Sequence, residues 1–85
     1  MAIEQSVLVE LLTLPGCHLC DAAREVTARV CEAEGVEFVE INIDQNPALR
    51  AQHNTEVPVV KVAGVVKDFW QINPRRLAKA IRAAQ

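Results

Sequence analysis

A helical segment that lies between two strand-like segments constrains the fold of this chain most. Val7 to Leu12 is apolar apart from Glu10, which indicates a largely buried strand. His18 to Glu34 has helical periodicity, and Gly35 is placed to end that helix. Glu37 to Asp44 then alternates apolar and polar side chains, as a strand with one solvent-facing side does. Two strands joined through a helix pair in parallel with a right-handed crossover, so this half of the chain predicts a β-α-β unit.

The same periodicities predict which side chains are buried. In the helix, the apolar stripe consists of Leu19, Ala23, Val26 and Val30. In the second strand, the apolar side consists of Val39, Ile41 and Ile43. We expect both sets to face the core, and the polar opposite side places this strand near an edge of the sheet.

The second half of the chain predicts a short helix, a hairpin and a final helix. Asn46-Pro47 is a helix cap followed by a first-turn proline, so a short helix runs to about His53. Pro58 to Val62 and Val65 to Phe69 are joined by Ala63-Gly64, which is typical of an antiparallel hairpin. A second cap-and-proline pair opens the last helix. The order is therefore β-α-β-α-β-β-α, an α/β fold with a four-stranded mixed sheet flanked by helices.

Length and composition predict one small domain and exclude several classes of function. The 85 residues, 1–85, are expected to form a single domain. The net charge is -2, and no basic stripe indicates a nucleic-acid partner. The first apolar run is far shorter than the ~20 residues of a membrane span, and no basic region precedes it as in a signal peptide. We therefore expect a soluble, cytoplasmic monomer with no membrane partner.

Two of the three cysteines form a Cys17-x-x-Cys20 motif at the start of the first helix. A thiolate is the attacking species in disulfide exchange, and a helix N-terminus stabilises an anion. Helical phase turns Cys17 to solvent and puts Cys20 at the margin of the apolar stripe. Cys17 is the candidate nucleophile and Cys20 the candidate resolving thiol. His18 has two interpretations, a modulating residue whose protonated ring stabilises the Cys17 thiolate, or a plain surface side chain.

The element order, the Cys-His-Leu-Cys motif and the proline before the third strand resemble the glutaredoxin branch of the thioredoxin fold over almost the whole chain. The resemblance implies a thiol–disulfide oxidoreductase with no required cofactor. It also implies that Pro58 is cis and packs against the active-site cysteine, and that the backbone of Val57 pairs with an extended substrate like an added strand. The implied partners are protein or low-molecular-weight disulfides as substrates, and a reductase or a small thiol as reductant.

The groups with which glutaredoxins hold glutathione are missing from this sequence. Leu14 stands where a lysine is common, Glu56 replaces a threonine, and the last helix lacks the paired glycines and the aspartate before it. Glutathione carries two carboxylates, so a lost cation and a nearby anion weaken its binding by on the order of 1 kcal/mol or more. Glutathione is therefore a possible but disfavoured ligand. Phe69 and Trp70 occupy this region instead, and we expect them to pack in the core or at its rim, with a platform for a partner as the alternative.

A metal or iron–sulfur site is the alternative interpretation of the cysteine pair. A zinc site usually needs four ligands in paired clusters. Beyond the pair the chain offers Cys31, His18 and His53 and no second cluster, so one chain predicts no metal ligand set. We expect Cys31, ~16 Å further along the helix, to be a small semi-buried side chain and His53 to be solvated. Two chains with small thiols could still complete a site, so a non-enzymatic binding module or a redox-sensing adaptor remains a hypothesis.

Overall fold

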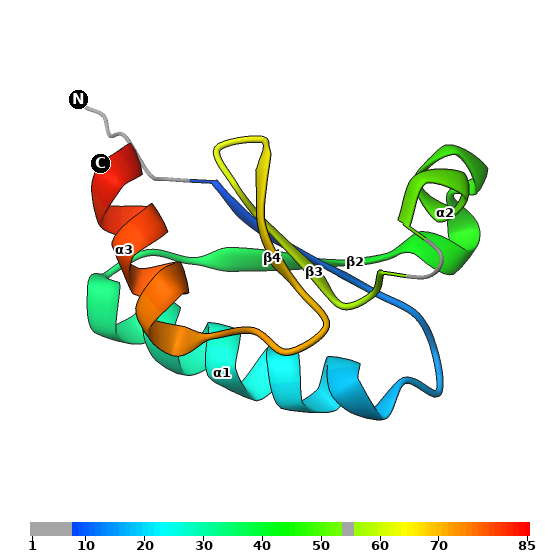
Figure 1. Cartoon of the computed structure of the whole chain (residues 1–85), viewed down its shortest axis with the longest axis horizontal. Helices are drawn as coiled ribbons and strands as arrows, with labels where there is room; N and C mark the ends of the chain where they lie inside the picture. The colour runs from blue at the N-terminus through cyan, green and yellow to red at the C-terminus, as the bar shows by residue number, and fades with distance from the viewer. Residues whose placement is uncertain (1–7, 54–55) are drawn as a thin grey trace.

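Within residues 8–53 and 56–85, which the computed structural model describes, a four-stranded sheet carries three α-helices (Figure 1). The elements in chain order are β1 (Val9–Thr13), α1 (His18–Glu34), β2 (Phe38–Asn42), the 3-10 turn η1 (Ile43–Gln45), α2 (Pro47–His53), β3 (Val59–Val62), β4 (Val65–Phe69) and α3 (Pro74–Ala84). The strand order is β2-β1-β3-β4, with β1 and β2 parallel and the other neighbours antiparallel. This arrangement confirms the predicted α/β fold of the thioredoxin type.

Helices pack on both faces of the sheet, and each face has its own core. The larger core lies between the sheet and the helices α1 and α3, and Figure 1 shows α3 beside the C-terminal half of α1. Its buried side chains include Val9, Leu11, Ala23, Val60, Leu77 and Ile81. The smaller core, on the side of α2, consists of Leu12, Ile43 and Val59 with Leu49 packed against them. The neighbours Leu11 and Leu12 enter different cores because successive residues of a strand point to opposite faces.

The ends of the elements follow the local signals in the sequence. Gly35 ends α1 with a φ of 74°, and the N–H of Val36 donates to the carbonyl of Cys31 at 2.9 Å. Such a closing bond needs a left-handed residue after the helix, a conformation that glycine adopts without strain. The hairpin residues Ala63 and Gly64 have φ values of 53° and 82°, the backbone of a two-residue turn between twisted antiparallel strands.

The buried face of α1 differs from the predicted stripe at its N-terminal end. Its buried residues are Cys20, Ala23, Thr27, Val30 and Cys31. Leu19 is 44% exposed, so the prediction that it faces the core is wrong. In the first turn of α1 the buried side chain is Cys20, and Leu19 borders an open groove beside Trp70 instead. Cys31 is fully buried at 2% exposure rather than semi-buried.

The prediction that Val39 is buried with Ile41 and Ile43 is also wrong, because Val39 is half exposed. In the sheet Val39 pairs with Glu10, and Glu10 pairs with Lys61, so these three side chains share one face. The seven-residue helix α2 packs at the end of that face, near Ile43. It is too short to reach the row that contains Val39. The predicted edge position of this strand is confirmed, since β2 is an outer strand.

Candidate active site

The two motif cysteines lie where the loop after β1 enters α1. Cys17 is the N-cap residue of α1, and its Sγ accepts a hydrogen bond from the backbone N–H of Cys20 at 3.1 Å. Helix N-termini carry N–H groups without intrahelical partners, and they favour an anion by about 0.3–1 kcal/mol. Cys17 is partly exposed, so a disulfide in solution has access to the sulfur that sits at this favourable position.

Cys20 lies one turn further into α1 and differs from Cys17 in environment. Only 1% of its surface is exposed. Burial raises the pKa of the Cys20 thiol to about 11, and its hydrogen bond with the Cys17 side chain adds to the rise. The two thiols are not joined in a disulfide. The structure therefore brings together one accessible sulfur and one shielded sulfur, with Cys20 deeper than the margin that helical phase predicted.

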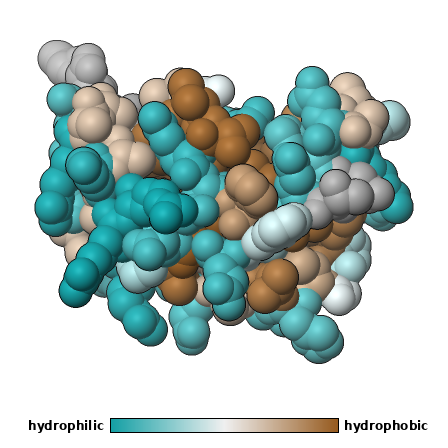
Figure 2. Space-filling model, in the orientation of Figure 1, coloured by the Kyte–Doolittle hydropathy of each residue, from teal (hydrophilic) through white to brown (hydrophobic). Residues whose placement is uncertain are grey.

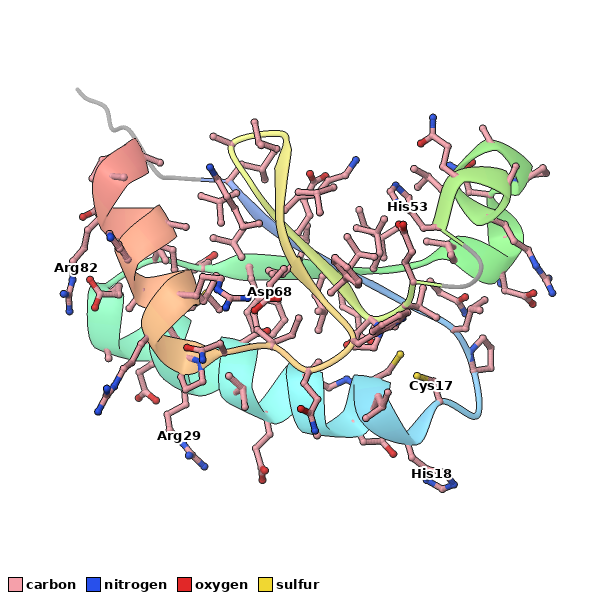
Figure 3. The ribbon with its side chains drawn as sticks, in the orientation of Figure 1. Cys17, His18, Arg29, His53, Asp68 and Arg82 are labelled. Atoms are coloured by element: carbon pink, nitrogen blue, oxygen red, sulfur yellow. The ribbon has the colours of Figure 1, made fainter. Side chains whose placement is uncertain are left out.

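His18, between them in the sequence, is directed away from both. Its side chain is exposed, and Figure 3 shows the imidazole on the outer side of α1 while the Cys17 sulfur points toward the sheet. The structure does not bring the ring and the sulfur together, which favours the surface interpretation of His18 over the modulating one.

The loop before β3 faces the first turn of α1. The peptide bond between Val57 and Pro58 is cis, as the resemblance implied. Pro58 is fully buried, and its carbonyl accepts a hydrogen bond from the N–H of Trp70 at 2.8 Å. Val57 is partly exposed and shares a groove with Leu19 of α1. Of the two residues predicted to form a substrate edge, Val57 therefore lines this groove opposite Leu19 of the motif, and Pro58 is buried behind it.

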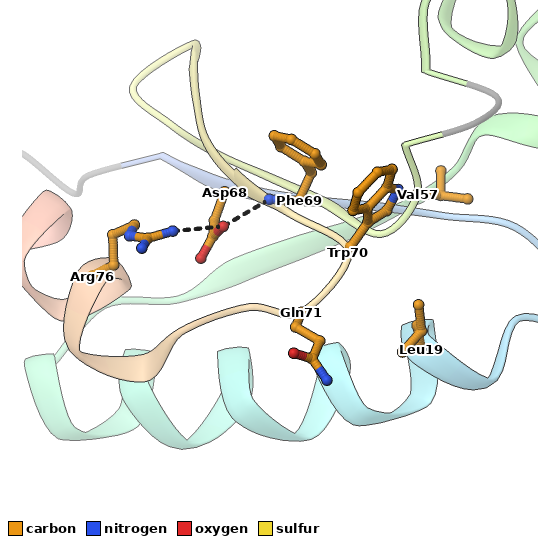
Figure 4. A pocket seen from close by; sticks show the side chains of 7 residues that line it. All are labelled: Leu19, Val57, Asp68, Phe69, Trp70, Gln71 and Arg76. Atoms are coloured by element: carbon orange, nitrogen blue, oxygen red, sulfur yellow. Dashed lines mark hydrogen bonds and ion pairs between the residues drawn. The ribbon is translucent and has the colours of Figure 1, made fainter.

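The groove has a volume of about 760 Å³ and is largely apolar on its walls (Figure 4). Besides Leu19 and Val57, two neighbouring aromatic residues line it, Phe69 and Trp70. They are 43% and 52% exposed, so neither packs in the core, and they lie at its rim or serve as the platform that is the alternative. Their rings meet edge to face with centroids 5.0 Å apart. The chain turns at Trp70, whose φ of 65° is left-handed, and both rings stay at the surface.

Asp68 holds this turn, and sequence analysis missed it. Its carboxylate is 7% exposed and accepts hydrogen bonds from the backbone N–H groups of Phe69 at 3.0 Å and Asn73 at 2.9 Å. It also accepts one from Arg76 Nη1 at 3.1 Å. Asp68 pairs with Val60, a core residue, so it occupies an inward position of β4. A charged residue at an inward strand position just before a helix cap was the signal that could have revealed it.

A second polar cluster joins α1 to β1 and β2. Arg24, one turn after Cys20 in α1, donates to both carboxylate oxygens of Glu40, at 2.6 and 2.7 Å. Glu40 also accepts from the hydroxyl of Thr13, the last residue of β1, at 2.9 Å. The Arg24 guanidinium holds the pKa of the Glu40 carboxyl below its ordinary value. The cluster fixes the side of α1 that carries Cys20 against the strand that precedes the motif.

The prediction that His53 is solvated is wrong. His53 ends α2 and is buried, with Nδ1 3.2 Å from Oε1 of Glu56. The N–H of Glu56 also donates to the carbonyl of His53 at 2.9 Å. The two residues form a His–carboxylate pair, and Glu56 directly precedes the cis peptide bond of Val57 and Pro58.

Residues 8–53 and 56–85 hold neither a metal-ligand cluster nor a membrane-spanning helix. No three His, Cys, Asp or Glu side chains are grouped there as metal ligands. No helix in this part of the chain is long and apolar enough to cross a membrane.

Comparison with known proteins places the chain in a family. The model of the Glutaredoxin-like domain (DUF836) matches residues 8–82. The chain belongs to this glutaredoxin-like family. An uncharacterized protein of Mycobacterium tuberculosis is 34% identical over 74 residues, which are 81% of this chain and 76% of that protein.

Solved structures agree with the family. A structural-genomics protein of X. campestris, XcR50, has a TM-score of 0.74 and 29% identity, and the alignment covers 91% of this chain and 99% of that one. Mitochondrial thioredoxin 3 of Saccharomyces cerevisiae has a TM-score of 0.68 and 22% identity, with 94% and 80% coverage, which shows a shared fold. A glutaredoxin-like protein with the thioredoxin fold has a role related to thiol redox chemistry, and here Cys17 and Cys20 are the motif thiols.

Proposed function

We propose that this glutaredoxin-like protein is a thiol–disulfide oxidoreductase, with Cys17 as nucleophile and Cys20 as resolving thiol. The observation that carries the proposal is the difference between the two sulfurs. Cys17 is accessible and caps a helix with its sulfur on a backbone N–H, whereas Cys20 is shielded one turn away. Substrates are protein or low-molecular-weight disulfides, and a reducing cytoplasmic setting and a monomeric protein are part of the proposal.

In the first step the Cys17 thiolate attacks one sulfur of a substrate disulfide. The substrate S–S bond breaks, a mixed disulfide forms between Cys17 and one half of the substrate, and the other half leaves as a thiolate that takes up a proton. Negative charge on Cys17 before the attack is supported by the N–H of Cys20 and the other N–H groups of the first turn.

In the second step Cys20 releases the bound half. Cys20 loses its proton to solvent and attacks Cys17 Sγ, which forms the intramolecular disulfide and expels the second substrate thiol. The substrate gains two electrons and two protons, and the protein dithiol is oxidised. Two of the causes that raise the Cys20 pKa, the hydrogen bond and the charge of Cys17, disappear when Cys17 is in the mixed disulfide. A small thiol or a dithiol reductase then restores the reduced protein.

The substrate is held as an extended chain in this proposal. The residue before a cis proline, Val57, offers its backbone across the groove from the motif, and an extended peptide adds there as a short strand. Pairing of this kind recognises the backbone of the substrate and aligns its disulfide with Cys17.

The test uses three single-cysteine variants and a mixed-disulfide substrate. Cys17→Ser is expected to abolish turnover, and Cys20→Ser to accumulate a one-to-one adduct on Cys17, detected by intact mass. Cys31→Ser is the control, because Cys31 is buried at a distance along α1 and takes no part. If the wild-type Cys17 is unreactive toward disulfides, the proposal is wrong. A coloured, metal-containing protein after anaerobic purification, with Cys17 and Cys20 protected from alkylation, would favour the binding-module hypothesis instead.

A further inference from the structure

We propose that the groove beside the motif binds a bulky apolar side chain of an extended protein substrate, two residues from its reacting cysteine, and does not bind glutathione. This inference rests on the proposed function, because it assigns the substrate class of the same site. The argument uses the position of the groove, the conformation of its aromatic wall and its charge.

The groove adjoins the motif through Leu19 and the substrate edge through Val57. Leu19 lies between the two motif cysteines, and Val57 directly precedes Pro58, so one wall belongs to the motif and another to the substrate edge (Figure 4). In an extended chain, side chains two residues apart point to the same face. A substrate whose cysteine points at Cys17 therefore turns the side chains two residues away toward the same surface of the protein, where this groove opens.

The third wall of the groove consists of two aromatic side chains that stay exposed, Phe69 and Trp70. Figure 2 shows hydrophobic surface gathered over the β3–β4 hairpin. Phe69 ends β4 and Trp70 follows it, and they are 43% and 52% exposed. Trp70 holds a left-handed backbone, with φ at 65°, which costs free energy for any residue with a side chain. Backbone strain that a fold retains is concentrated at functional positions. Exposed aromatic rings in a groove are the usual anchors for an apolar side chain.

The charges of the groove match an uncharged occupant. Its lining includes one cation, Arg76, and one anion, Asp68, and these two are paired at 3.1 Å. The Asp68 carboxylate also accepts hydrogen bonds from the backbone N–H groups of Phe69 and of Asn73, the N-cap of α3. The Asp68 carboxylate thus uses the backbone N–H groups that a carboxylate of the ligand would need as hydrogen-bond donors. Glutathione carries two carboxylates, so the groove offers it no unmatched positive charge.

The test compares two isomeric peptides as mixed disulfides with 2-nitro-5-thiobenzoate, whose release is followed by absorbance. In Ac-Phe-Ala-Cys-Ala-Phe-amide the rings lie two residues from the cysteine, and in Ac-Ala-Phe-Cys-Phe-Ala-amide they lie next to it. We expect the first to react about tenfold faster, since an anchored aromatic ring contributes about that factor. Trp70→Ala is expected to bring the ratio of the two rates close to one. Val65→Ala, which removes an equally exposed apolar side chain at the other end of β4, outside the groove, should keep the wild-type ratio.

The mixed disulfide of mercaptoethanol with the same leaving group separates the two proposals. If it too fails to react with Cys17, the oxidoreductase proposal fails. If it reacts but the isomeric peptides react equally fast with the wild type, the docking proposal fails while the activity stands. A faster reaction of the glutathione mixed disulfide than of either peptide would also overturn the docking proposal.

A binding measurement keeps the inference testable if Trp70→Ala alters the fold. Trp70 is the single tryptophan of the chain, so its emission reports on the groove. Titration of Cys17→Ser with Ac-Phe-Ala-Ser-Ala-Phe-amide is expected to shift the emission to the blue as water leaves the ring. An emission unchanged by this peptide, or shifted equally by its isomer, contradicts docking in the groove.

Discussion

Iodoacetamide reacts with thiolates, so its rates at Cys17 and Cys20 should differ widely in the reduced protein. The Cys20 thiol is buried, and burial, together with the hydrogen bond to Cys17, raises its pKa from 9.0 to about 11. A rise of two units lowers the thiolate fraction at pH 7 about 100-fold relative to an ordinary thiol. It corresponds to a preference for the neutral thiol on the order of 2–3 kcal/mol in the folded state.

The assay is alkylation of the reduced protein at several pH values, with the modified residues identified by peptide mass spectrometry. At pH 7, Cys17 should be modified first and Cys20 at least about 100-fold more slowly than the same cysteine in urea-unfolded protein. The rate at Cys20 should rise about tenfold per pH unit and level off near pH 11. A rate at Cys20 in the folded protein equal to that in urea, or one that levels off near pH 9, would refute the reasoning.

The same shift predicts the direction in which pH changes the stability of the reduced protein. The folded-state pKa of Cys20 lies above its unfolded value, so the contribution of the neutral thiol is fully present below about pH 9. It is lost as the pH rises toward 11, because the unfolded chain gives up the proton first. The urea midpoint should therefore fall over this range more steeply in the wild type than in Cys20→Ala, and parallel curves would contradict the assignment.

Two further substitutions test the packing of α1. Thr27 is fully buried, and its hydroxyl has no hydrogen-bond partner among the described residues, so Thr27→Val should raise the free energy of unfolding by roughly 1 kcal/mol, measured in urea. Thr27→Ala is the matched control and should lower the free energy of unfolding, since the smaller side chain leaves a cavity. A loss of stability in Thr27→Val would mean that the Thr27 hydroxyl is hydrogen-bonded. Gly35→Ala should lower the free energy of unfolding by about 1–2 kcal/mol, because φ is 74° there. Gly35→Asn should lose less, and equal losses in the two variants would point to a cause other than backbone conformation.

Local signals in the sequence predicted the elements well because each depends on a few neighbouring residues. The caps before α2 and α3, the glycine after α1 and the two-residue hairpin turn all appear where the sequence placed them. The cis bond at Pro58 is different, since local preference favours trans. It followed from the resemblance, and the structure confirms it.

The wrong predictions all concern side chains whose surroundings come from distant segments. Leu19 has the helical phase expected of a core residue, but it lines an open groove and is 44% exposed. Val39 alternates correctly, yet α2 ends before it reaches that row of the sheet. His53 is a polar residue at the end of a short helix, yet it is buried and paired with Glu56. In each case the sequence pattern predicts which side of its element a residue faces. It does not predict whether another element covers that side.

By itself the sequence determined the order of the elements, the parallel β-α-β unit and the place of Cys17 at the start of a helix, because these depend on periodicity, caps and chain connectivity. Only the tertiary structure decided that Cys20 is buried, with 1% of its surface exposed. It also decided that Asp68 holds the turn before α3 and leaves Trp70 exposed beside the motif. Burial and charge pairing are properties of segments that meet in space, and no local pattern in the chain records them.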